Sequence, residues 1–203
     1  MLENFKKIRF SNFKRFLSES LLIVFSVLFA LFINQCQNEA QEEKRTVSIL
    51  KNIKSELENN RKSAQRLVDY HTKVVKKLET INSDSLESIF FRGPRFVIWD
   101  NDIIPRGISQ EIFKNIAWQT AEQEDIASRI NFNKAQVLFE AYSQQNTVSA
   151  TIDALSKMMT QRETHRRELI KETVAVIQQT FAELRAQEKA LVYRLDDALQ
   201  LFK

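Results

Sequence analysis

Apolar residues recur at alternating spacings of three and four between residues 50 and 81, which is the pattern of one face of an amphipathic helix. The positions of this first stripe are Leu50, Ile53, Leu57, Asn60, Ala64, Leu67, His71, Val74, Leu78 and Ile81. Only Asn60 and His71 are polar among them. Because the spacing also fits a heptad repeat, as in a coiled coil, it predicts a long helix that packs against other helices.

Two further stripes of the same kind occupy the carboxy-terminal third. The second consists of Leu138, Ala141, Gln145, Val148, Ile152, Leu155 and Met159, and the third of Ile170, Val174, Ile177, Phe181, Leu184, Glu188, Leu191, Leu195, Ala198 and Phe202. The polar segment 160–167 between them predicts a tight turn with Thr160 or Thr164 as a helix N-cap, and one uninterrupted helix is the alternative. Three long amphipathic helices predict an all-α fold, an elongated antiparallel three- to four-helix bundle.

The most apolar segment lies near the N-terminus, where Ser26 is the only polar residue between positions 21 and 33. Its large apolar side chains are Leu21, Leu22, Ile23, Val24, Phe25, Val27, Leu28, Phe29, Leu31, Phe32 and Ile33. These 13 positions span about 20 Å as a helix, which is short of the ~30 Å hydrocarbon core. Phe16 and Leu17 extend the apolar surface, and bilayer thinning absorbs the remaining mismatch. We therefore predict a single transmembrane helix over 16–35 that continues into the bundle.

Two other interpretations of this segment are a cleaved signal peptide and a buried core helix. Cleavage is disfavoured because residues 34–40 contain no triplet with small residues at the −3 and −1 positions. A core helix is disfavoured because basic residues gather on one side of the segment only. Residues 1–20 contain Lys6, Lys7, Arg9, Lys14 and Arg15 against two glutamates.

The position of the basic residues also predicts the orientation of the anchor. The chain carries 30 basic and 26 acidic residues, and the excess lies before the apolar segment, since the other 183 residues hold 25 and 24. The positive-inside rule then places a basic tail, 1–15, in the cytoplasm and residues 36–203 in the periplasm, from the inner membrane outward. A folded part with balanced charge favours membrane lipid over nucleic acid as a partner.

The helix-breaking residues divide the exterior part of the chain. Gly93, Pro94, Pro105 and Gly107 are all the glycines and prolines of the 203 residues. Their clustering predicts a long helix over 37–82, an irregular insert over 83–131 and a helical hairpin over 132–203. Within the insert we expect short helices over 83–91 and 109–121 and a short turn over 125–130. Such a composition excludes turn-rich sheets and glycine-rich phosphate loops.

Part of the chain resembles a known group of proteins. Glu19–Gln35 is followed by a charged stretch and by Ile49-Leu-Lys-Asn-Ile-Lys-Ser-Glu-Leu-Glu-Asn-Asn60, and Ala117-Trp-Gln-Thr-Ala121 lies further on. These segments resemble an uncharacterised family of small bacterial (Bacteroidota-type) membrane proteins, over roughly residues 15–65. Cys36 stands where the family often has a tryptophan after the anchor. The resemblance implies one N-terminal anchor and a helical periplasmic domain, and it implies no activity.

Four polar residues interrupt the apolar stripes, namely Asn60, His71, Gln145 and Glu188. One interpretation is that they set the register of the helices or face solvent. The other is that they form a buried polar cluster that binds a ligand or senses pH. A carboxylate-bridged di-iron site is excluded, because neither histidine has a glutamate three residues before it.

The insert contains a loop, 96–102, that combines aromatic and acidic residues, with Phe96, Trp99, Asp100 and Asp102 as its candidate partner-docking residues. The alternative is that its aromatic rings close the end of the bundle. Asp100 and Asp102 have no accompanying catalytic motif, so we expect no enzymatic activity. With one cysteine and two histidines we also expect no metal and no cofactor.

These observations lead to two functional hypotheses. The first is a non-enzymatic, membrane-anchored interaction or scaffold component of the cell envelope, with a protein partner or further copies of itself and no identified small-molecule substrate. The second is a periplasmic accessory subunit that senses a ligand or stress and signals through a membrane partner, because about 15 cytoplasmic residues are too few for an output domain.

Overall fold

A computed structural model describes residues 2–97, 102–108 and 111–203 of the chain, with side chains from Phe16 onward. Its helices and strands are α1 (Leu2–Glu79), the 3-10 helix η1 (Ser83–Ser85), α2 (Leu86–Phe90), β1 (Phe91–Arg92), β2 (Arg95–Phe96), α3 (Ile116–Gln123), α4 (Ile126–Arg129), α5 (Phe132–Thr160), the 3-10 helices η2 (Glu163–His165) and η3 (Arg167–Leu169), and α6 (Ile170–Gln200). The fold is therefore all-α, with one two-residue strand pair in the described part. The chain divides into two compact units, Met1–Ser48 and Ile49–Lys203.

The first unit is the amino-terminal part of α1. Every large apolar side chain that the sequence places in the anchor is exposed here, from Leu21 at 71% to Ile33 at 41%. This is the one helix among the described residues that is long and apolar enough to cross a membrane. Ser26 donates to the carbonyl of Leu22 at 2.8 Å, so its hydroxyl is satisfied within the helix.

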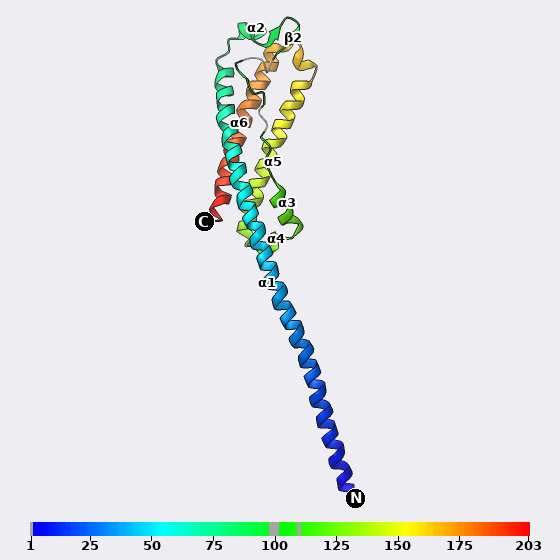
Figure 1. Cartoon of the computed structure of the whole chain (residues 1–203). Coiled ribbons are helices and arrows are strands. Elements are labelled where there is room, and N and C mark those ends of the chain that lie inside the picture. Colours follow the sequence, from blue (N-terminus) through cyan, green and yellow to red (C-terminus); the bar gives the residue numbers. More distant parts are fainter. Residues whose placement is uncertain (1, 98–101, 109–110) are drawn as a thin grey trace. The chain divides into compact units, whose positions relative to one another are not determined.

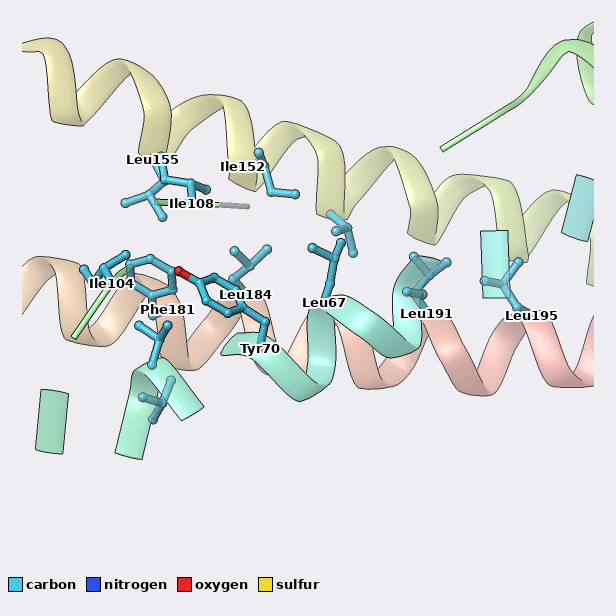
Figure 2. Close-up of a cluster of buried hydrophobic side chains, with 14 of the residues drawn as sticks. Leu67, Tyr70, Ile104, Ile108, Ile152, Leu155, Phe181, Leu184, Leu191 and Leu195 are labelled. Carbon is cyan, nitrogen blue, oxygen red and sulfur yellow. The ribbon is translucent and has the colours of Figure 1, made fainter. Parts of the chain in front are cut away.

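The second unit is built on three long helices, the later part of α1 together with α5 and α6, which lie side by side (Figure 1). Their shared core contains the apolar positions of all three predicted stripes, with only Leu50, Ile81 and Phe202 partly buried. Figure 2 shows Leu67 of α1, Ile152 and Leu155 of α5 and Phe181 of α6 pointing toward one another. The helical spacing of these residues was thus a correct guide to which side chains the fold buries.

Pairs of side chains fix the relative direction of the helices in this unit. Thr151 of α5 donates to Gln187 of α6 at 2.7 Å. Arg61 of α1 pairs with Asp196 of α6 at 3.0 Å, which links the third helix to this pair. Glu140, earlier on α5, pairs with Arg194, later on α6, at 2.8 Å. Contacts of this kind show that α6 runs antiparallel to α5.

The insert begins as a short capped structure at the end of α1. Asn82 caps η1 by accepting from the backbone N–H of Asp84 at 3.1 Å, and α2 follows directly. The strands β1 and β2 then form a tight antiparallel hairpin in which Phe91 pairs with Phe96. Gly93 lies in the hairpin turn with φ +62°, a left-handed conformation that favours glycine. The sequence analysis expected the helix and missed the hairpin.

The helix predicted over 109–121 is shorter than expected, since α3 begins only at Ile116. Residues 111–115 have no regular secondary structure. The reason is non-local, because both backbone groups of Lys114 bond to the side chain of Asn60, at 3.0 Å for its N–H and 2.6 Å for its carbonyl. Groups used in this way are unavailable to a helical ladder.

The turn between α5 and α6 confirms the predicted break, but the predicted N-cap is wrong. Leu169 occupies the N-cap position of α6. Thr164 is buried and donates to the carbonyl of Met158 at 2.6 Å, while the ring of His165 donates from Nε2 to the carbonyl of Met159 at 2.9 Å. Both side chains therefore satisfy carbonyls at the end of α5 instead of N–H groups at the start of α6.

Candidate functional site

The feature that organises the polar residues is the irregular connection between β2 and α3, described over 102–108 and 111–117 and called here the connecting segment. It runs antiparallel to α1. Lys77 of α1 donates to the carbonyl of Asp102 at its start, and Glu56 of α1 accepts from the N–H of Ala117 at its end. A segment without its own ladder needs partners for its backbone groups, and α1 supplies them.

The first part of the connecting segment, 102–108, is bound by two neighbouring residues of α1, Tyr70 and His71. The hydroxyl of Tyr70 donates to the carbonyl of Gly107 at 2.7 Å and accepts from the N–H of Arg106 at 3.1 Å. The guanidinium of Arg106 lies over the Tyr70 ring, 5.1 Å from its centre. Burial raises the pKa of Tyr70 despite these contacts, so its hydroxyl stays a donor at neutral pH.

The adjacent His71 links the connecting segment to α6. It is fully buried, as is Glu188. Its Nε2 lies 2.8 Å from the carbonyl oxygen of Ile108, and its Nδ1 lies 2.7 Å from Oε1 of Glu188. The carbonyl only accepts, so Nε2 must carry a hydrogen. The charge of each group then depends on whether the proton between them is bound to Nδ1 of His71 or to Oε1 of Glu188.

Either position of that proton leaves the buried pair without net charge. On Nδ1 it makes an imidazolium beside a carboxylate, and on Oε1 it makes two neutral groups. Burial raises the pKa of Glu188, and the hydrogen bond and charge of His71 oppose this effect. Oε2 of Glu188 accepts no hydrogen bond from any described residue, which disfavours a carboxylate there. We therefore assign the proton to Glu188 in the folded state.

A second polar cluster lies about three helical turns before His71 on α1. Asn60 pairs with both backbone groups of Lys114 and donates to Oε1 of Gln145 at 2.8 Å. Gln145 of α5 in turn donates to the Lys114 carbonyl at 3.2 Å. The two side chains are 2% exposed each, so these buried amides provide the partners for both backbone groups of Lys114.

The third cluster holds the beginning of α3. Glu56 accepts from the hydroxyl of Tyr142 at 2.7 Å with one oxygen and from the N–H of Ala117 at 3.0 Å with the other. Burial and the neighbouring Glu56 both raise the pKa of Tyr142, so the phenol remains the donor. The Tyr142 ring stacks on Trp118 at 5.0 Å between ring centres. Trp118 is half-buried and covers the Tyr142 ring at the start of α3.

These contacts explain the four polar residues that interrupt the stripes. They form two separate pairs, Asn60 with Gln145 and His71 with Glu188, and each pair binds the chain's own backbone. Glu56 and Tyr142 were not among the predicted site residues, and they lie beside the stripe positions Leu57 and Ala141. An acidic and an aromatic residue at the edge of a stripe give no signal of burial unless the third element that covers them is known.

The candidate docking residues of the insert lie in different surroundings. Phe96 is half-buried, with its ring 5.1 Å from that of His165 and 5.4 Å from that of Phe91, so it packs against the core. Asp102 is exposed. Trp99 and Asp100 lie outside the described residues. Among the described residues, no three His, Cys, Asp or Glu side chains are placed to hold a metal ion.

A shallow groove of about 310 Å³ lies beside the third cluster, between α1 and the start of α3. Ile49, Ile116 and Ala117 form its apolar part, and Asn52 and Lys114 are among its polar residues. Ile116 is 70% exposed, and Ile112 in the connecting segment is 88% exposed. Such an apolar centre with a polar surround is the usual composition of a protein-binding surface.

No family model, curated protein or solved structure matches this chain.

Proposed function

We propose that this chain is a non-enzymatic, single-pass protein of the bacterial inner membrane that acts as an interaction or scaffold component of the cell envelope. The N-terminus lies in the cytoplasm, and residues 36–203 form a periplasmic domain, an elongated antiparallel bundle. The family resemblance over residues 15–65 agrees with this organisation and is part of the same proposal.

The exposed apolar side chains of the first unit support the membrane anchor. Residues of this size are normally removed from water by folding, yet Leu21, Phe25 and Phe29 are each more than half exposed. A bilayer supplies the apolar surroundings that they lack. The excess of Lys and Arg before the apolar stretch supports the proposed orientation.

The observation that carries the interaction role is the exposure of two apolar side chains, Ile116 in the groove between α1 and α3 and Ile112 four residues before it in the connecting segment. The surrounding connecting segment is fixed by Asn60 and Glu56, so the two isoleucines are presented on a held backbone and do not simply fold inward. A preorganised apolar surface of this kind binds a protein partner without a large ordering cost.

Site-specific photocrosslinking in intact membranes tests this role. A photoreactive phenylalanine analogue at Ile116 should give a discrete adduct, and Ile112→Lys should remove it. The matched control is the same analogue at Tyr193, an exposed residue of α6, which should give no adduct of that size. An adduct of about twice 23.8 kDa identifies a second copy of the chain. Absence of an adduct at both Ile112 and Ile116 would contradict the proposal.

A second candidate function, stress sensing for a membrane partner, is favoured by the buried pair of His71 and Glu188. The pair binds the connecting segment at the carbonyl of Ile108, so a change in its proton count occurs beside that segment. Burial raises the pKa of Glu188, so this carboxyl group keeps its proton above the pH at which an ordinary glutamate loses it.

A further inference from the structure

A cavity of about 370 Å³ lies between α3, α4 and the beginning of α5. Its floor is formed by buried side chains of three elements, with Ile53 of α1, Ile126 of α4 and Leu138 of α5 each no more than 1% exposed. The cavity is open to solvent on one side, where Phe132 and Phe139 are 76% and 60% exposed. Its size is within the range of small-molecule sites in proteins.

The wall of this cavity is held in place by polar contacts behind it. Trp118 lines the cavity and stacks on Tyr142, whose hydroxyl is bonded to the buried Glu56. Glu56 also holds the N–H of Ala117, the residue before Trp118. Movement of the indole into the cavity would break the stack over this bonded pair. The open volume is therefore a property of the fold and is not removed by a simple change of one rotamer.

The lining defines the chemistry of an occupant. Its only polar side chains are Glu122 and Gln136, and both are exposed. Water inside an apolar cavity finds few hydrogen-bond partners, so a hydrocarbon group is the better occupant. If a methylene takes about the ~30 Å³ of a water molecule, the cavity holds roughly a dozen methylenes. The open side requires a molecule with one apolar end inside and one polar end outside.

The charge of Glu122 at the opening of the cavity also restricts which headgroup a ligand can have. Glu122 repels a carboxylate and attracts an ammonium group that lies near it. A free fatty acid would place its carboxylate there, whereas a phospholipid with an ethanolamine headgroup would offer an ammonium. If the apolar N-terminal stretch spans a bilayer as proposed, phospholipids surround that stretch and are available to the chain.

We propose that this cavity binds one acyl chain of a bilayer phospholipid whose headgroup ends in an ammonium, with the headgroup at Glu122. The inference rests on the proposed membrane anchor for the supply of lipid. It adds to the interaction role a lipid-binding site that is distinct from the groove at Ile116.

Lipid photolabelling of the full chain tests this site. The protein is placed in nanodiscs of phosphatidylethanolamine that contain a trace of the same lipid with a diazirine in its acyl chain, and adducts are mapped by mass spectrometry after illumination. We expect adducts both in the segment 16–35 and in the segment 118–139. Labelling of 118–139 by a diazirine fatty acid at the same concentration should be about tenfold weaker, which corresponds to about 1.4 kcal/mol.

Variants that fill the cavity provide the control. Ala135→Trp and Ala127→Trp each place an indole in it, and Ala127 is exposed, so its replacement leaves the core intact. Both should lower labelling of 118–139 about tenfold and leave labelling of 16–35 unchanged. Ala150→Trp, at an exposed position of the same helix as Ala135, should change neither.

The outcomes separate the lipid site from the anchor. Labelling confined to 16–35 would refute the lipid site and leave the anchor standing, and labelling of 118–139 that both tryptophans leave unchanged would refute it as well. Equal or stronger labelling by the fatty acid would overturn the headgroup assignment. Absence of labelling in both segments would count against anchor and site together.

Discussion

At the scale of single residues, the buried pair of His71 and Glu188 shows how the chain places polar groups inside an apolar core. Each group is fully buried, and the pair stays neutral because one proton is shared between Nδ1 and Oε1. The carbonyl of Ile108 completes the arrangement by accepting from Nε2. A polar pair of this kind is tolerated only while its proton count is kept, which makes it sensitive to pH.

We predict that Glu188→Gln flattens the dependence of stability on pH. Burial raises the pKa of Glu188 above its ordinary value of 4.5, so between the two values the folded chain keeps a proton that the unfolded chain has lost. This contribution to the free energy of unfolding is complete below pH 4.5 and is lost as pH rises through the raised pKa. The slope for one proton is at most about 1.4 kcal/mol per pH unit.

Urea unfolding, followed by circular dichroism between pH 7 and 9, measures this slope, because the histidines of an unfolded chain, with a pKa of about 6.5, are neutral there and do not offset it. Glutamine cannot titrate, but its amide can still donate to Nδ1 of His71, so the fold should be retained. Glu183→Gln, at an exposed position on the same helix, should keep the slope of the unchanged chain. If Glu188→Gln also keeps that slope, Glu188 is not the group whose proton is lost.

At the scale of elements, the connecting segment is the part of the fold that depends most on distant residues. The long helices follow from local periodicity, which is why all three stripes were found in the sequence, polar members included. The segment 109–121 also has a helical pattern, but Asn60 binds both backbone groups of Lys114 from 54 residues away. Sequence reading assigns a local preference, and here a long-range pairing overrides it.

The end of α5 gives a second example of the same limit. Threonine near a predicted helix start suggests an N-cap, yet Thr164 bonds to the carbonyl of Met158 and thus closes the preceding helix. Composition identifies such a residue as one that binds the backbone. Which helix end it binds depends on the path of the turn, which two short 3-10 helices, η2 and η3, define here.

We predict that Asn60→Leu releases the connecting segment while the long helices remain. The change leaves the N–H and the carbonyl of Lys114 without Asn60 as a partner, at a cost of roughly 2–4 kcal/mol in the free energy of unfolding. Hydrogen exchange should become faster at the Lys114 amide and stay slow in the middle of α5 and α6. Asn59→Leu, at the exposed neighbouring position, is the control and should change neither. Unchanged exchange at Lys114 would show that Asn60 does not hold the segment.

At the scale of the whole molecule, the chain combines a very apolar first unit with a charge-balanced helical unit. The sequence predicted an all-α chain with one long apolar helix near its N-terminus, and the structure has both. The sequence did not predict the groove at Ile116 or the cavity beside Trp118, because both depend on where α1 packs against residues more than 50 positions further along the chain. The two proposed binding roles depend on the first unit lying in a membrane with the second unit outside.

The accessibility of Cys36 in intact cells tests that arrangement most directly. It is the only cysteine of the chain, it is exposed, and it lies just after the predicted span. After removal of the outer membrane, a membrane-impermeant maleimide should label Cys36 without lysis. A chain with Cys36→Ser and Ser11→Cys should be labelled only after lysis. Labelling of Cys36 only after lysis, with labelling of the Ser11→Cys chain before it, would contradict the account.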